Sequence, residues 1–313
     1  MVSHEYFHIW NVKRLRPENL GPFNYDAENY TTNLWISEGF TAYYDNLMLR
    51  KAGLIDESTY LSFLSNDINA VENRPGNKLQ TLKESSFDAW IKQYRQNENS
   101  INTTVTYYNK GALIALLLDL EILQATKGEK GLDAVMKAMY DQYYKKEDRG
   151  FTEAEFIAMA EKKAGKSLTP IFDYVDSATS LDYNTYLKFA GLMLVNAAEG
   201  SELADLGVKT TLQNGKLVVT NVMSGSGAWV NGINVKDEII SIDNIRINSS
   251  LEIDNLLKSA KPGDEIQVLV SRDGILKPLS VTLSQNNTKQ YFIMPLGNIT
   301  EDQIEIRKAW LGL

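Results

Sequence analysis

The chain has 313 residues, of which 43% are hydrophobic and 23% charged, the balance of a folded protein with room for two domains. Its formal net charge of -8 argues against nucleic acid as a partner, because phosphate binding requires a basic surface. The lack of cysteine excludes disulfides and thiolate metal ligands but leaves the compartment open. The longest apolar run, 111–118, is too short to span a membrane.

The first two thirds of the chain have the pattern of helices. Apolar residues recur at spacings of three and four, which predicts helices over 34–49, 100–125 and 132–144. Another helix is predicted to begin after Thr152, which can form a capping box with Glu155. It is predicted to run to Ala164 and to end at Gly165.

From residue 207 onward the pattern is that of strands, with short β-branched runs separated by Asn-Gly, Pro-Gly and Asp-Gly turns. The predicted strands are 216–222, 238–242, 265–270 and 279–283, and a helix capped by Ser249 or Ser250 is predicted over 251–260. The fold class is therefore predicted to be α+β. We expect a helical domain in 1–184, a small domain in 185–289 and a C-terminal tail in 290–313.

The chain contains only two histidines, His4 and His8, and Glu5 lies between them in an H-E-x-x-H pattern. Residues four apart share one face of a helix, so both imidazoles can bind one metal ion. Glu5 is rotated by about 100° from His4, which places it beside the ion, where it can act as a general base. The pattern is the signature of zinc peptidases and predicts one zinc ion per chain. The alternative is a helix with incidental histidines.

A catalytic zinc ion requires a third protein ligand. Since there is no further histidine and no cysteine, that ligand must be a carboxylate. Glu38 is the predicted ligand, because it lies in a second helical stretch after a loop long enough to turn the chain back. The alternative is an ordinary surface glutamate near a helix start.

Three stretches of sequence resemble a known family: HEYFHIWNVKRLRP at 4–17, LWISEGFTAYYD at 34–45 and TYYNKGALIALLLDL at 106–120. They are similar to the glycyl aminopeptidase family of gluzincins, bacterial metallopeptidases with a thermolysin-like catalytic domain followed by a PDZ domain. The resemblance extends to 307–312. It implies zinc ligands at His4, His8 and Glu38, a general base at Glu5, and a PDZ-like, partly open β-barrel or sandwich after the helical domain.

The stretch 108–111 is similar to the tyrosine-x-lysine-glycine element of gluzincin aminopeptidases, whose tyrosine steadies the tetrahedral intermediate. The resemblance assigns this role to Tyr108. A phenol suits the role, because its hydroxyl can donate to an oxyanion without carrying a competing charge. The alternatives are Tyr107 in the same role, or two tyrosines that only pack at a helix start.

Residues 203–208, 218–222, 226–233 and 237–243 are similar to bacterial PDZ domains. In such domains a peptide adds as a strand to a sheet edge, and N–H groups of a loop capture its terminal carboxylate. The resemblance implies that Leu206, Gly207 and Val208 form this loop beside the helix 251–260 and bind a C-terminal peptide. The alternative is a PDZ fold with an unused groove.

The predicted function is that of a zinc-dependent peptidase, by resemblance an aminopeptidase that acts on peptides with small N-terminal residues such as glycine or alanine. The rival is a peptide-binding PDZ protein with an empty metal site. The family carries a β-rich region before the zinc helix, whereas this helix begins at the chain start. We therefore expect the chain to be truncated at its N-terminus and to hydrolyse peptides poorly, and the absence of a signal peptide says nothing of the compartment.

Overall fold

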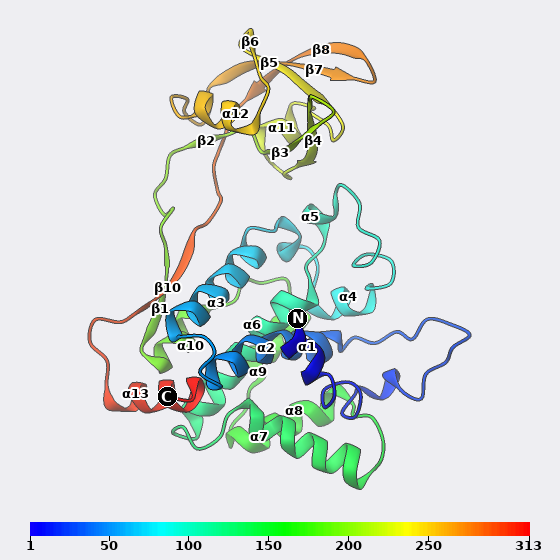
Figure 1. Ribbon diagram of the computed structural model, residues 1–313, viewed down its shortest axis with the longest axis vertical. Helices are drawn as coiled ribbons and strands as arrows, with labels where there is room; N and C mark the ends of the chain where they lie inside the picture. Colours follow the sequence, from blue (N-terminus) through cyan, green and yellow to red (C-terminus); the bar gives the residue numbers. More distant parts are fainter. The chain divides into compact units, whose positions relative to one another are not determined.

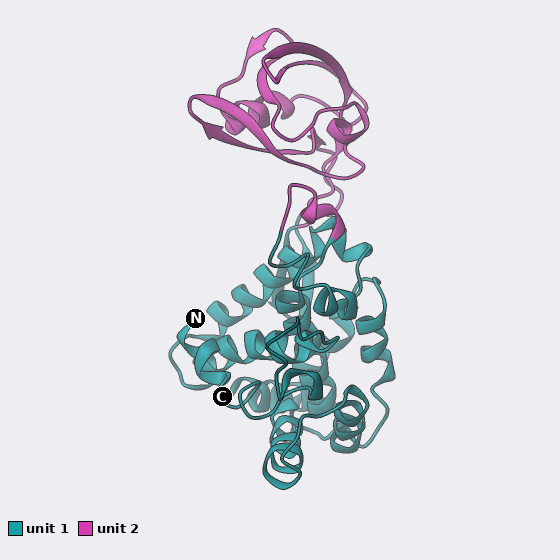
Figure 2. Ribbon diagram, turned by 90° about the vertical axis from the view of Figure 1, so that its right-hand side faces the viewer, with its two compact units in different colours: residues 1–95, 104–197, 290–313 teal, residues 96–103, 198–289 magenta.

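The computed structural model describes residues 1–313 and divides them into two compact units. The first unit contains residues 1–95, 104–197 and 290–313, and the second contains 96–103 and 198–289 (Figure 2). These limits correct the predicted domains 1–184, 185–289 and 290–313. Residues 185–197 and the C-terminal segment belong to the helical unit, and 96–103 belongs to the second unit.

The first unit is built of helices around one central helix, α6 (Figure 1). Residues of α6 are buried continuously from Lys110 to Leu123, so the helix is covered on all sides and not on one face only. The elements of this unit are α1 (Val2–Phe7), η1 (Glu18–Leu20), η2 (Trp35–Gly39), α2 (Phe40–Lys51), α3 (Glu57–Glu72), η3 (Pro75–Lys78), α4 (Leu82–Phe87), α6 (Tyr107–Ala125), α7 (Leu132–Met139), η4 (Tyr140–Lys146), α8 (Glu153–Ala164), α9 (Thr169–Asp176), α10 (Tyr183–Leu187), η5 (Lys188–Ala190), β1 (Leu192–Asn196), β10 (Tyr291–Pro295) and α13 (Glu301–Leu311).

The predicted helices are present, with interruptions that the apolar spacing did not reveal. The helix predicted over 34–49 begins with the π-helical turn η2 before α2, and the one over 132–144 ends in the π-helix η4. The helix predicted over 100–125 is broken between α5 and α6, where Thr106 caps α6. The capping box of Thr152 and Glu155 is confirmed, and the left-handed Gly165 ends α8.

The C-terminal segment completes the helical unit and is not a separate tail. β10 pairs antiparallel with β1, and α13 follows it. Trp310 of α13 is fully buried, its indole N–H donates to the Tyr43 hydroxyl at 2.8 Å, and its ring packs edge-on against Tyr60. Residues at the end of the sequence therefore fill the same core as α2 and α3.

The second unit is an antiparallel sheet with three short helices. Its strands follow the order β3-β4-β5-β7-β8, β6 pairs with β5, and β2 pairs with β9 in a separate ladder. The elements are α5 (Ser100–Thr103), β2 (Ala204–Asp205), β3 (Val208–Gln213), β4 (Lys216–Val222), α11 (Gly227–Val230), β5 (Glu238–Ile242), β6 (Ile245–Arg246), α12 (Ser250–Leu257), β7 (Glu265–Arg272), β8 (Ile275–Thr282) and β9 (Ser284–Gln285). The sheet is open at β3 and β8, as a PDZ-like partly open architecture requires.

The predicted strands 216–222 and 238–242 are confirmed, and that over 265–270 extends to Arg272. The last predicted strand, 279–283, begins earlier, at Ile275, because Asp273 and Gly274 make a tight hairpin turn with positive φ angles. The helix predicted over 251–260 is α12, with Ser249 as its N-cap. None of the helices combines the length and apolar character needed to cross a membrane.

Candidate metal centre

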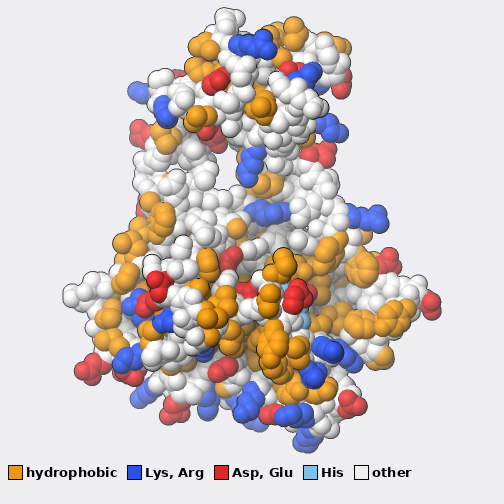
Figure 3. Space-filling view, viewed as in Figure 1, with side chains coloured by type: hydrophobic (Ala, Val, Ile, Leu, Met, Phe, Trp, Pro, Cys, Tyr) orange, Lys and Arg blue, Asp and Glu red, His pale blue; other side chains and the backbone are white.

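Helix α1 presents the two histidines to the same side. His8 follows the last helical residue, and its N–H still bonds to the carbonyl of His4. The two imidazole rings lie 4.8 Å apart, nearly perpendicular to each other. The pairing expected from the spacing of four residues is therefore present. Their side chains are partly exposed, and Figure 3 shows a histidine surface on a face where hydrophobic side chains gather.

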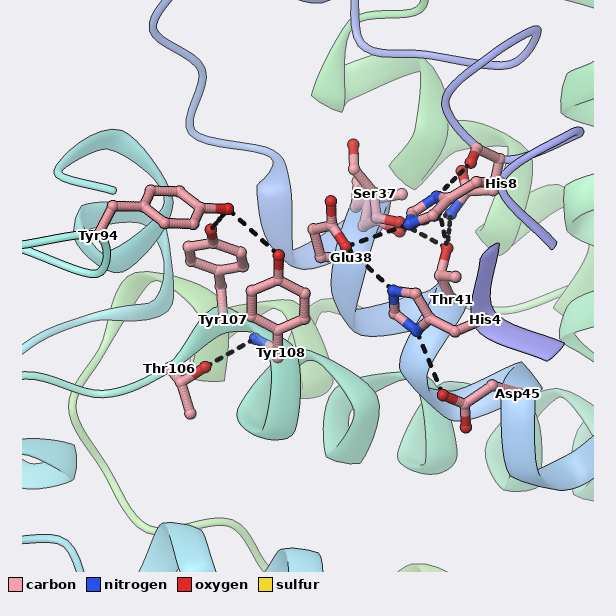
Figure 4. A network of polar contacts seen from close by, with 12 residues as sticks. His4, His8, Ser37, Glu38, Thr41, Asp45, Tyr94, Thr106, Tyr107 and Tyr108 are labelled. Carbon is pink, nitrogen blue, oxygen red and sulfur yellow. Dashed lines mark hydrogen bonds and ion pairs between the residues drawn. The ribbon is translucent and has the colours of Figure 1, made fainter. Parts of the chain in front are cut away.

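Glu38 reaches the histidines from the π-helical turn η2. This turn lies directly on α6, because Gly39 and Gly111 touch backbone to backbone; a Cβ atom on Gly39 would come within 2.6 Å of Gly111. A π-helical turn is a frequent feature of functional sites, since it changes the direction of the side chains it carries. Here it brings Glu38 Oε2 to 3.4 Å from His4 Nε2 and 3.3 Å from His8 Nε2 (Figure 4).

The three side chains form one group of donors. Ligand atoms of His4, His8 and Glu38 all lie within 4.8 Å of one another. Two imidazole nitrogens and one carboxylate oxygen are a donor set that binds zinc in catalytic sites, where a fourth position stays open for water or substrate. The residues present therefore fit the metal that the H-E-x-x-H pattern predicts.

The outer nitrogen of each imidazole is held by a second contact. His4 Nδ1 lies 3.2 Å from Asp45 Oδ2, and His8 Nδ1 lies 2.9 Å from the carbonyl oxygen of Asn11. Buried Asn11 in turn donates through its side chain to the carbonyls of Ile36 and Ser37, which ties the end of α1 to η2. Such contacts fix the ring orientation and leave both Nε2 atoms facing Glu38.

Asp45 was not predicted from the sequence, although a signal was available. It lies seven residues after Glu38, or two helical turns, so both carboxylates project from one side of the η2–α2 stretch. Burial raises the pKa of Asp45, while the hydrogen bond from His4 works in the opposite direction.

The carboxylate of Glu38 is kept ionised by the histidines. Burial raises the pKa of Glu38, but hydrogen bonds and charge from His8 and His4 outweigh it and hold the pKa below its usual range. The hydrogen bond to Glu38 is the largest cause that raises the pKa of His8, and the nearby charge of Glu5 adds to it. The group thus attracts positive charge, whether a proton or a metal ion.

Glu5 lies beside this donor group and not within it. Its side chain is exposed on α1, it makes no hydrogen bond or ion pair, and it is absent from the converging set of ligand atoms. Glu5 is therefore next to His4 on α1 but outside the group of converging donor atoms.

A cluster of three tyrosines borders the histidines on the other side. The Tyr108 ring lies 6.3 Å from that of His4, and Tyr108 stands on the histidine side of the cluster in Figure 4. Tyr107 is fully buried and donates to the Tyr94 hydroxyl at 3.2 Å, while the Tyr94 and Tyr108 hydroxyls are 3.3 Å apart. Burial is the largest cause that raises the pKa of Tyr108, so its phenol keeps its proton. Tyr94 was not predicted, because nothing in its local sequence marks it.

Of the predicted loop residues in the second unit, Leu206 and Gly207 join β2 to β3, and Val208 is the first residue of β3. The loop lies at a groove of about 320 Å³ between β3 and α12. Gly207 has a φ of +80°, and a Cβ atom there would overlap Ser226, so only glycine fits. The N–H of Gly207 donates to Asp205 Oδ1 at 3.0 Å. One amide of this segment is therefore already bonded inside the chain.

A helical domain with an H-E-x-x-H helix facing a glutamate, together with a small open sheet domain, defines a gluzincin-like protein with a PDZ-like module. Residues 1–114 match the M61 glycyl aminopeptidase family, and residues 204–283 match the PDZ domain family. A crystal structure of an aminopeptidase N family protein from Idiomarina loihiensis is similar over 98% of this chain, with 31% identity and a TM-score of 0.88. Residues 1–114 are thus similar to the M61 glycyl aminopeptidase family and residues 204–283 to PDZ domains, which agrees with the resemblance found in the sequence.

The chain spans 53% of the length of the Idiomarina protein. Two further structures match smaller parts. The HtrA-type protease AlgW with a decapeptide has 21% identity and a TM-score of 0.26 over 27% of this chain and 30% of that chain. A serine endoprotease from Yersinia pestis has 24% identity and a TM-score of 0.25 over 27% of this chain and 30% of that chain. The comparison with curated proteins gave no match.

Proposed function

We propose that this protein is a zinc-dependent peptidase in which His4, His8 and Glu38 bind one zinc ion. The observation that carries the proposal is the convergence of three donor groups within 4.8 Å, with both outer imidazole nitrogens already held. A zinc ion bound there would supply a Lewis acid that lowers the pKa of water and polarises a carbonyl group. The M61 family match of the same residues supports this assignment.

The remaining roles belong to side chains around the donor group. Glu5, with its exposed and unbonded carboxylate, takes a proton from the attacking water and returns it to the leaving amine. Tyr108 donates its hydroxyl to the oxyanion that forms on the scissile carbonyl. When Tyr107 donates to Tyr94 and Tyr94 donates to Tyr108, the proton of Tyr108 is left for the substrate and the chain of bonds polarises it.

The proposed substrates are peptides with a small N-terminal residue, glycine or alanine, which makes the enzyme an aminopeptidase. The support for this choice is the family match, whose description is that of a glycyl aminopeptidase. Initial rates on a panel of glycyl, alanyl, leucyl and phenylalanyl arylamides test it. Higher kcat/KM for the leucyl and phenylalanyl compounds would contradict the preference for small residues.

Metal content is the most direct test of the site, because it does not depend on turnover. After zinc loading and dialysis, elemental analysis should give about one equivalent per chain, as a single three-ligand site requires. His8→Ala should lose this zinc, whereas the matched variant Glu5→Gln should keep it and lose hydrolysis. Parental zinc content in His8→Ala would show that the ligand assignment is wrong, and near-parental turnover in Glu5→Gln would exclude the general base.

A second candidate function, peptide binding without catalysis, is favoured by one observation, the groove between β3 and α12 of the PDZ domain. Zinc content and turnover distinguish the two candidate functions. A chain that binds peptides but neither zinc nor substrate would be a binding protein with an empty metal site.

A further inference from the structure

The groove of the second unit is built to accept an extended polypeptide. β3 pairs with β4 on one side only, so its other edge offers unpaired backbone groups toward α12. The floor of the groove is apolar, formed by Leu206, Val208, Ile253 and Leu257. A peptide that adds to β3 as a strand would bury alternate side chains on this floor.

The loop at the groove already holds a carboxylate from the chain itself. Asp205 Oδ1 accepts the N–H of Gly207 at 3.0 Å, and the backbone of Asp205 is fixed by its pairing with Ser284 across β2 and β9. A free peptide C-terminus that approached this loop would compete for the same donor. It would also meet a like charge close by, which disfavours an ionised terminal carboxylate.

A second carboxylate stands on the helix side of the groove. Ser250, Ile253, Asp254 and Leu257 follow the spacing of one helical face and line the groove together. Asp254 is exposed and makes no hydrogen bond or ion pair within the chain. The one basic residue in the lining is Lys209, so two carboxylates face one ammonium group. The balance of charge is negative and favours a basic ligand.

We propose that this groove binds an internal, extended polypeptide segment, in which a lysine or arginine lies two residues from an apolar side chain, and not a free C-terminus. Residues two apart in a strand face the same side, so both side chains enter the groove. The apolar side chain covers the floor, and the basic side chain pairs with Asp254. The inference concerns the PDZ domain alone and goes beyond the proposed peptidase activity.

The test is a selection from two random heptapeptide libraries on phage, one displayed with free C-termini and one with each peptide flanked on both sides by glycine-serine spacers. The bait is the whole chain with Glu5→Gln, which prevents cleavage of the displayed peptides if the protein is a peptidase. We expect enrichment from the flanked library, with a basic residue two positions from an aliphatic one. Enrichment only from the free C-termini, or from neither library, would overturn the proposal.

Variants then separate the charge of the loop from its geometry. Asp205→Asn keeps an oxygen for the Gly207 N–H but removes the charge, and should strengthen binding of free-acid peptides at least tenfold relative to their amides. Asp254→Asn should weaken binding of the selected basic peptides at least tenfold, whereas the control Lys209→Gln should leave it unchanged or tighter. Fluorescence anisotropy gives the affinities, and circular dichroism confirms folding. A parental protein that binds free acids tenfold tighter than amides contradicts the inference.

Discussion

The replacement Lys110→Met is expected to stabilise the protein. Lys110 lies in α6 within the tyrosine-x-lysine-glycine element and is fully buried, and its ammonium nitrogen has no hydrogen-bond partner. Burial lowers the pKa of Lys110 to about 8, although the charge of Glu72 opposes the shift. An unpartnered charge in an apolar core is unfavourable, and methionine fills a similar volume without it.

The size of the effect follows from the change in pKa. An unfolded lysine has a pKa of about 10.4, so a folded pKa of about 8 corresponds to about 3 kcal/mol of destabilisation while the side chain is charged. The unfolded state holds the proton more tightly, so stability rises with pH. The destabilisation by the charged Lys110 side chain is complete below about pH 8 and disappears as the pH rises toward about 10.4. Lys110→Met should therefore gain up to about 3 kcal/mol at pH 7 and much less at pH 10.

Urea unfolding at pH 7 and pH 10, followed by far-UV circular dichroism, measures both quantities. Lys162→Met on the exposed side of α8 is the matched control and should change stability by less than about 0.5 kcal/mol at either pH. The reasoning is refuted if Lys110→Met is less stable than the parent, or if the difference between the two proteins is the same at both pH values. Either result would mean that the ammonium group has a partner in solution.

Four other replacements test the site and its support. Asp45→Asn should weaken zinc affinity about 10- to 100-fold in a chelator competition, because it loosens the orientation of His4; unchanged affinity would make Asp45 irrelevant to the metal. Tyr108→Phe should lower kcat by roughly a hundredfold with zinc content unchanged, and loss of zinc alone would mark it as structural. Tyr94→Phe should lower kcat by roughly fivefold, the effect of one supporting hydrogen bond. A fivefold rise in KM would indicate a contact with the substrate instead. Gly111→Ala should destabilise by about 1–3 kcal/mol in thermal unfolding, since its Cβ would lie 2.8 Å from the Trp35 carbonyl, and a parental melting temperature would show that η2 can move away.

The parts of the site that follow from local spacing were predictable. His4, Glu5 and His8 are close in sequence, and one turn of helix is enough to bring the two histidines to the same side. Glu38 followed from the shortage of other donors and from the resemblance to a family. The spacing of seven residues from Glu38 could have indicated Asp45, whereas Tyr94 becomes a neighbour of the site only through the packing of the segment before α6, which no local pattern reports.

The fold shows the same division between local and distant information. The capping box of Thr152 was predictable because both partners lie within one turn. The π-helical turn η2 was not, because the apolar spacing of 34–49 also fits an α-helix. The domain limits were wrong where contacts join distant residues. Asn102 bonds to Val222 in the second unit, and Trp310 bonds to Tyr43 in the first.

The pairing of β1 with β10 has a consequence for the order in which the protein is made. The chain leaves the helical unit at Ala197 and re-enters it at Gln290, where the two residues are hydrogen-bonded at 2.8 Å. A ribosome therefore completes the PDZ domain before it adds α13, and the helical core stays without Trp310 until then. The inserted domain can fold while its host is still unfinished, and the helical unit is completed last.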